Sequence, residues 1–203
     1  MDVYFSPLAC SLASRIALYE TGQSATFHRV DTKAGKTASG EDYRKINPKG
    51  LVPALRTDDG EVLTENAAIL PYIADRTPDA GLAPTGFARY RLQQWLSFIS
   101  AELHKAVFTP LLGKDFPPEA KAKAAADATP RLAYLNDHLT GRDWLLDAFS
   151  VADGYLCAVL NWNQAVKLDF GPYPAIRDFQ ARVMARPAVA KAVQEEFALY
   201  QPA

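Results

Sequence analysis

Strand-like segments in this chain are concentrated in its first eighty residues, and helical patterns fill most of the remainder. Residues 3–5 (VYF) are β-branched and aromatic, and residues 25–31 (ATFHRVD) alternate apolar and polar side chains as a half-buried strand does. The segments VPALRT and EVLTE flank the turn DDG at 58–60, a strong signal for a tight hairpin. From residue 86 onward strand signals nearly vanish. The sequence therefore predicts a small α/β domain followed by an all-helical one.

Helical patterns separate the strands of the first part. Residues 11–22 place apolar side chains at near-helical spacing and stop at Gly22, while residues 41–46 predict a short helix and residues 65–76 a final one. The resulting order, βαβαββα with an antiparallel hairpin near its end, matches a thioredoxin-like layer of sheet and helices. We expect residues 1–80 to form this α/β thioredoxin-like N-terminal domain.

The second part is predicted to be an all-α C-terminal domain over residues 87–203, joined by a linker at 77–86. A long amphipathic helix is expected over 87–112, and another continues to residue 139 from a start at Pro117 or Pro118.

Three further helices complete this second part. Ser150 and Asp153 have the spacing of a capping box at the head of a buried helix that contains Trp162. The last two helices are separated near Arg186-Pro187.

Charge and composition exclude several classes of protein. The 203 residues carry a formal net charge of -1, which gives no electrostatic reason to expect nucleic acid or an anionic membrane as a main partner. The uncharged stretch at 154–166 is too short to span a bilayer, and no signal peptide is visible, so we expect a cytoplasmic protein. Two cysteines imply no disulfide scaffold, and the histidines show no metal-ligand spacing.

Cys10 lies in the segment SPLACSLAS, where a strand gives way to a helix. Free cysteines are often buried filler, but a thiol at a helix start experiences the positive end of the helix dipole, which favours the thiolate. Ala13 stands where a redox dithiol would have its second cysteine, so the site is a monothiol. Such a thiol can form a mixed disulfide with an external thiol but cannot resolve it internally. Cys157, inside an apolar run, is expected to pack in the core.

Pro53 stands at the head of a strand, in the segment NPKGLVPAL. Because proline cannot donate a ladder hydrogen bond, it suits an edge or a special turn, and a cis Val52-Pro53 bond would expose the main chain of Val52 to a peptide-like ligand. A loop proline that merely ends one element is the alternative.

Glu65 and Asn66 occupy the first turn of the helix after the hairpin, with Thr64 as its expected cap. A carboxylate beside a helix N-terminus suits the zwitterionic head of an amino acid, because the carboxylate binds the ammonium and the free N–H groups bind the carboxyl group. A plain cap with a dipole partner is the alternative interpretation.

Five segments taken in order, SPLACSLA, NPKGLVPAL, LTENAAILPYIAD, ELHKAVFTPL and FSVADGYL, resemble the cytosolic glutathione transferases, specifically the bacterial beta class. The resemblance covers essentially the whole chain. It implies a thioredoxin-like glutathione domain, a helical domain that forms most of the pocket for a small hydrophobic electrophile, and a homodimer. Glutathione is then a co-substrate, and no tightly bound cofactor is implied.

The resemblance also implies roles for residues of the first domain. Cys10 resembles the cysteine that faces the glutathione sulfur and can form a mixed disulfide with it, and Ser11 assists through its backbone N–H and hydroxyl. Val52, before Pro53, resembles the residue that pairs with the cysteinyl part of glutathione. Glu65 and Asn66 match the pair that holds the γ-glutamyl head, although the family more often has Ser or Thr at the second place.

Other roles come from the loop and from the helical domain. The loop lysine that meets the glycyl carboxylate is assigned to Lys36. His104 and Lys105 match helix residues facing the active thiol and the glutathione carboxylates, and Ser97 falls where the family has an asparagine. The aromatic residues Trp162, Phe108 and Phe116 are candidates for lining the second pocket.

The sequence thus leads to a hypothesis of function with two alternatives. In the main hypothesis the protein binds glutathione, stabilises its thiolate and conjugates it to small electrophiles. The alternatives are a glutathione-dependent thiol-disulfide oxidoreductase, which the monothiol Cys10 suits, and a non-catalytic adaptor on the same fold.

Overall fold

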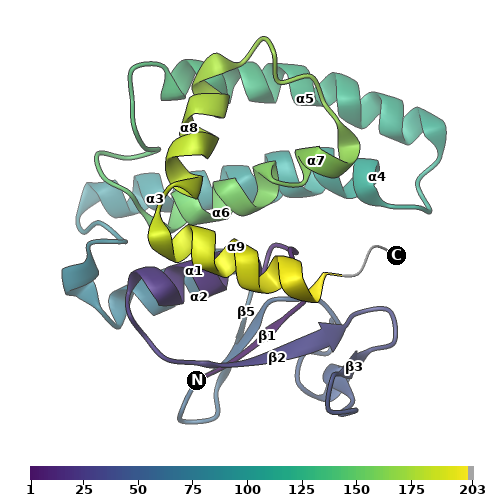
Figure 1. Cartoon of the computed structure of the whole chain (residues 1–203), viewed down its shortest axis with the longest axis vertical. Helices are drawn as coiled ribbons and strands as arrows, with labels where there is room; N and C mark the ends of the chain where they lie inside the picture. The colour runs from purple at the N-terminus through teal and green to yellow at the C-terminus, as the bar shows by residue number, and fades with distance from the viewer. Residues whose placement is uncertain (201–203) are drawn as a thin grey trace.

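The first half of the chain forms a mixed five-stranded sheet. A computed structural model describes residues 1–200 (Figure 1) and gives the strand order β3-β2-β1-β4-β5. The pair β1–β2 is parallel, and the pairs β1–β4, β2–β3 and β4–β5 are antiparallel. The strands are β1 (Asp2–Phe5), β2 (Thr26–Asp31), β3 (Lys36–Thr37), β4 (Ala54–Arg56) and β5 (Val62–Thr64).

The hairpin predicted around residues 58–60 is confirmed. The N–H of Thr57 donates to the carbonyl of Glu61 at 2.8 Å, and Gly60 takes a φ of +87°, which only glycine adopts readily. Ala54 in β4 pairs with Thr64 in β5 across this turn. The hairpin therefore fixes the register of the two strands that precede the helix at Asn66.

The α-helices of the first part pack on one face of the sheet, and further helices build the second part. The first-half elements are α1 (Leu12–Glu20), α2 (Asn66–Asp75) and the short 3₁₀ turns η1 (Tyr43–Lys45) and η2 (Pro78–Ala80). The second half contains α3 (Phe87–Phe98), the π-helical segment η3 (Ile99–Phe108), α4 (Thr109–Leu112), α5 (Pro118–Leu139), α6 (Val151–Leu160), α7 (Asn163–Val166), α8 (Pro174–Met184) and α9 (Pro187–Leu199).

Three local expectations were inexact. The helix expected over 41–46 is only the 3₁₀ turn η1, and the loop before it contains the two-residue strand β3. The buried helix headed by Ser150 ends at Leu160, so Trp162 lies just beyond it, at the N-cap of α7. The long helix expected over 87–112 is present, but ten of its residues are π-helical.

A single apolar core joins the two halves. Helix α1 packs on α2, α6 and α9, and Figure 1 shows α9 lying across α1 where the helical half meets the sheet half. Gly154 in α6 permits this approach, because a Cβ there would lie 3.0 Å from Cγ2 of Ile16 in α1. The opposite face of the sheet carries a smaller cluster that includes Tyr4 and Tyr43.

Asp153 organises the start of the buried helix α6. Its carboxylate accepts hydrogen bonds from the N–H and the hydroxyl of Ser150 and from the N–H of Leu145, each at 2.8 Å. Burial raises the pKa of Asp153 to about 6, and these hydrogen bonds oppose the rise. Over residues 1–200, none of the helices combines the length and apolarity needed to cross a membrane.

Candidate active site

The loop between β1 and α1 carries Cys10, a residue that is 9% exposed. Its Sγ donates a hydrogen bond to the carbonyl of Val52 at 3.3 Å. Ser11 is the N-cap of α1, and its hydroxyl donates to the carbonyl of Ser6 and accepts from the N–H of Ser6, both at 3.2 Å. The Ser11 side chain therefore closes this loop internally and does not reach the cavity beside Cys10, so the hydroxyl role expected for it has no support in the geometry.

Burial controls the protonation of Cys10. It raises the pKa of the thiol to about 12, whereas the Lys105 charge and the backbone N–H groups of Cys10 and Ser11 lower it by less. The expectation of a thiolate favoured by the helix dipole is therefore wrong for the free protein. The physical reason is that Cys10 precedes the first helical residue, Leu12, and is enclosed by packed side chains.

Val52 and Pro53 form the opposite wall. The Val52-Pro53 bond is cis, which is the first of the two alternatives considered for this proline, and β4 begins at Ala54. The amide of Asn47 donates to the carbonyl of Leu51 at 2.6 Å. This side-chain bond fixes the segment that presents the Val52 main chain.

Glu65 is the N-cap of α2, with a φ of +72°, and the helix begins at Asn66. Thr64 belongs to β5, so it is not the helix cap. Glu65 forms an ion pair with Lys49, and the Asn66 side-chain amide donates to the carbonyl of Cys10 at 3.0 Å. Both residues line the cavity, and Asn66 in addition ties α2 to the cysteine loop.

The helical half contributes His104 and Lys105 from η3 and Tyr155 from α6. The Nδ1 atom of His104 lies 3.3 Å from the Tyr155 hydroxyl, and the His104 ring meets that of Trp162 edge to face at 4.8 Å. Burial, followed by the Lys105 charge, lowers the pKa of His104 to about 4. His104 is therefore neutral near pH 7.

These residues surround a narrow polar cavity between the two halves. It brings together most of the residues singled out in the sequence: Cys10, Val52, Pro53, Glu65, Asn66, His104 and Lys105. Asn47, Lys49, Leu51, Thr64, Ser100 and Tyr155 complete the lining. The lining contains the cations Lys49 and Lys105 and the anion Glu65, a pattern suited to a small zwitterionic ligand.

A second cavity of about 650 Å³ opens on the other side of Cys10 and His104, which line both spaces. Residues 7–9, Trp162 and side chains of α8 and α9 form its walls, among them Met184 and Phe197. Its described lining contains no Asp, Glu, Lys or Arg. The cavity therefore suits an uncharged apolar molecule lying against the thiol.

The three aromatic residues proposed for the second cavity differ in whether they line it. Trp162 lines it, whereas Phe108 is fully buried with its ring 5.8 Å from that of Trp162, and Phe116 is not among the described lining residues.

Lys36 and Ser97 lie away from both cavities. Lys36 is in β3, at the far edge of the sheet from β4 and β5. Ser97 is exposed, and Ser100 lines the polar cavity in its place. Seven residues make two turns of an α-helix, so Ser97 would share the face of His104, but the wider π-helical turns rotate it away.

The sequence reasoning missed Lys49, Ser100 and Tyr155. Lys49 lies within the NPKGLVPAL segment, so its place beside the proline turn was an available signal. Ser100 precedes His104 by about one helical turn, which is a weaker signal. Tyr155 reaches the site only through the packing of α6, and no local pattern indicated it.

Comparison with known proteins places these features in a family. Residues 9–76 match the glutathione S-transferase N-terminal domain, and residues 99–187 match the glutathione S-transferase C-terminal domain. The chain is 43% identical to glutathione S-transferase GstA of Escherichia coli O157:H7 over 97% of its length and 98% of that protein.

Solved structures agree with this match. A sphingomonad glutathione S-transferase complexed with glutathione is 48% identical, with a TM-score of 0.93 over 97% of this chain and 99% of that one. The beta-class glutathione S-transferase of Sphingomonas chungbukensis is 43% identical, with a TM-score of 0.93 over 97% and 98% of the two chains. With the thioredoxin-like sheet, the helical half and the cysteine-bearing cavity between them, the chain belongs to the glutathione S-transferase family, in its bacterial beta class.

Proposed function

We propose that this transferase binds glutathione in the polar cavity and joins its sulfur to an uncharged electrophile held in the apolar one. The observation that carries this proposal is that Cys10 and His104 line both cavities. A sulfur placed beside them is within reach of a molecule on the other side. Holding two reactants at such a junction accounts for a large share of a bimolecular rate.

Glutathione would lie along the Val52 main chain. Glu65 would take its γ-glutamyl ammonium, and the cations of Lys49 and Lys105 would attract its carboxylates. A sphingomonad relative that is 48% identical to this chain is complexed with glutathione, which supports glutathione as the ligand. The role of Lys36 in holding the glycyl carboxylate passes to Lys49, because Lys49 lines the cavity and Lys36 does not.

Cys10 would act first as a hydrogen-bond donor. Because its pKa is raised to about 12, the thiol stays protonated near pH 7 and can donate to a glutathione thiolate beside it. Lowering the glutathione pKa from about 8.5 to about 6.5 requires about 3 kcal/mol, which this donor and the Lys105 charge supply together.

The chemical step would then be a displacement. The glutathione S–H proton passes first to a ring nitrogen of neutral His104, which is a transient acceptor, and then to solvent. The thiolate attacks the electrophilic carbon of an aryl halide, so that an S–C bond forms, the C–halogen bond breaks and halide leaves.

Thiol exchange at Cys10 is the second proposed activity. The Cys10 thiolate attacks one sulfur of glutathione disulfide, so that a Cys10–glutathione disulfide forms and one glutathione thiolate leaves and is protonated. The monothiol supports this step, whereas the raised pKa of Cys10 makes it slow in the free protein. Cys10→Ala should abolish the adduct on the intact protein, and an adduct that persists would assign it to Cys157.

A homodimer and a reducing compartment complete the proposal. Phe87 and Tyr90 in α3 are 73% and 71% exposed, and their rings contact each other, which suits a surface covered by a second copy. The free thiols Cys10 and Cys157 suit the cytoplasm. Sedimentation of the native chain and of Phe87→Ser tests the dimer, since the substitution should shift it towards monomer.

Calorimetry with glutathione, followed by conjugation of an activated aryl halide, tests the main proposal. We expect binding in the native protein, and weaker binding in Lys105→Met with its fold retained. The absence of glutathione binding by the native chain would overturn it.

A further inference from the structure

Leu8, two residues before Cys10, has an unusual backbone conformation. Its φ is +59°, in the left-handed region that residues other than glycine rarely adopt. Residues hold such conformations only where their surroundings impose them, and these positions cluster at functional sites. The surroundings of Leu8 are therefore informative.

Both polar groups of the Leu8 main chain are held by the helical half. Its N–H donates to Oε2 of Glu196 in α9 at 2.8 Å, and its carbonyl accepts from the indole N–H of Trp162, also at 2.8 Å. The two partners come from separate elements, 188 and 154 residues further along the chain. The helical half thus binds the cysteine loop at one residue through two hydrogen bonds, one to its N–H and one to its carbonyl.

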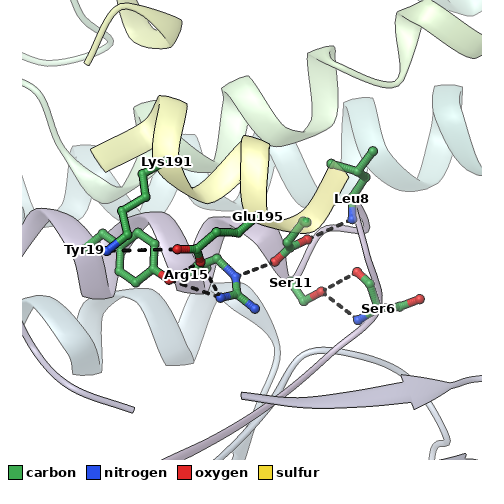
Figure 2. Close-up of polar contacts among 8 residues, drawn as sticks. Ser6, Leu8, Ser11, Arg15, Tyr19, Lys191 and Glu195 are labelled. Atoms are coloured by element: carbon green, nitrogen blue, oxygen red, sulfur yellow. Dashed lines mark hydrogen bonds and ion pairs between the residues drawn. The ribbon is translucent and has the colours of Figure 1, made fainter. Parts of the chain in front are cut away.

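The hydrogen bond to the Leu8 N–H comes from a rigidly held side chain. Glu196 is fully buried, and its Oε1 accepts from Nε of Arg15 at 3.0 Å. The guanidinium of Arg15 in turn lies 3.6 Å from the ring centre of Phe27, so it is held by the sheet. Figure 2 shows Arg15 on α1 between Leu8 and Glu195, with the dashed contacts of the network running along α9. A buried carboxylate with a fixed cation has little freedom to move, so Leu8 N–H has a fixed acceptor.

Displacement of Leu8 would be transmitted to Cys10. The loop is closed within itself by the Ser6 and Ser11 hydrogen bonds drawn in Figure 2, and Ala9 N–H donates to the carbonyl of Ser6 at 3.0 Å. Leu8 and Cys10 consequently belong to one compact turn.

We propose that Glu196 and Trp162 are positioning residues that hold Cys10 in place through the main chain of Leu8. Trp162 also lines the apolar cavity and contacts His104, so the wall that receives the electrophile and the loop that carries the thiol share one side chain. An effect of this shared side chain on the reaction with the electrophile rests on the proposed function, whereas the hold on Cys10 does not.

Alkylation by iodoacetamide tests the hold without any use of glutathione. The rate at Cys10 is followed by peptide mass spectrometry, with Cys157 as reference because it is buried in α6. In Glu196→Gln the side chain cannot accept hydrogen bonds from both Arg15 and Leu8 in this way, because its amide nitrogen is a donor and only its oxygen accepts. Trp162→Phe keeps an aromatic ring and removes the indole N–H.

We expect Cys10 alkylation to rise at least fivefold relative to Cys157 in each of these two variants. The matched control is Glu195→Gln, since Glu195 also bonds Arg15 and Tyr19 from α9. It should stay within twofold of the native rate. A change within twofold in Glu196→Gln or in Trp162→Phe overturns the role of that residue, and an equal rise in Glu195→Gln or at Cys157 overturns the mechanism, because it indicates general loosening.

Steady-state kinetics supply a readout that general loosening does not move. Residues 7–9 line the apolar cavity but not the polar one, so Glu196→Gln should raise the KM for the electrophile at least threefold and leave that for glutathione within twofold. An unchanged KM for the electrophile, or an equal rise in both KM values, would overturn the positioning role. If the native chain conjugates nothing, the proposed function fails, and the alkylation result still decides the hold on Cys10.

Discussion

The Cys10 thiol of the free protein should ionise only at high pH. Burial raises its pKa to about 12 from the ordinary value of 9.0. At pH 7 the thiolate fraction is then about one in 10⁵, against about one in 10² for an ordinary cysteine, so alkylation should be about a thousandfold slower than in an exposed peptide. Because the folded pKa is raised, the reactive form appears as pH rises.

The pH dependence separates ionisation from access. Enclosure of Cys10 slows alkylation at every pH equally, whereas an ionisation with a pKa near 12 makes the rate rise about tenfold for each pH unit from about 6 to about 9.5. Iodoacetamide trapping followed by mass spectrometry measures this slope, and Cys157→Ala confirms that the signal belongs to Cys10.

Lys105→Met sharpens the test. The Lys105 charge makes the largest contribution that lowers the pKa of Cys10. Its removal should slow alkylation about fivefold at a given pH, which corresponds to roughly 1 kcal/mol. A rate that levels off with a midpoint below about pH 8 would refute the reasoning, because it would show that the helix and the cation outweigh burial.

Three other outcomes follow from the geometry. Asp153→Ala leaves the N–H groups of Leu145 and Ser150 without their acceptor. The free energy of unfolding should therefore fall by about 3–5 kcal/mol and the Tm measured by calorimetry by about 10 °C, whereas Asp147→Ala, at an exposed position, should change neither quantity much. Lys49→Met should raise the KM for glutathione about tenfold and Lys36→Met less than twofold; the reverse order would return the role to β3. The pKa of His104 is about 4 in the folded protein, against 6.5 for an ordinary histidine, so its contribution to stability is present above pH 6.5 and is lost as pH falls towards 4. Between pH 7 and pH 5 the free energy of unfolding of the native protein should fall by about 2 kcal/mol more than that of His104→Gln, as measured by urea titration.

Local patterns predicted the elements that local physics determines. The hairpin at 58–60 involves residue types with narrow backbone preferences, so it could be predicted from a few residues. The residues around Pro53 limited that position to two alternatives, a cis bond or a loop proline, and the structure has the cis bond. Cys10 and Glu65 were assigned to one site by the family resemblance, and both line the polar cavity.

Features that depend on packing could not be predicted in this way. The pKa of Cys10 depends on enclosure by distant segments, and the exchange of Ser97 for Ser100 depends on a π-helical stretch that no local signal indicates. The contact of Glu196 with Leu8 joins residues 188 apart, so neither neighbourhood contains a sign of the other.

That contact also bears on the order in which the protein matures. A ribosome delivers the chain from its N-terminus, and domains generally fold as units as they emerge. The sheet half can therefore form early, but Leu8 acquires its carboxylate partner only after the ribosome has added 188 further residues. A nascent chain halted before α9 would have its sheet without the contact that holds the cysteine loop, so the thiol acquires its working environment only after α9 has been made.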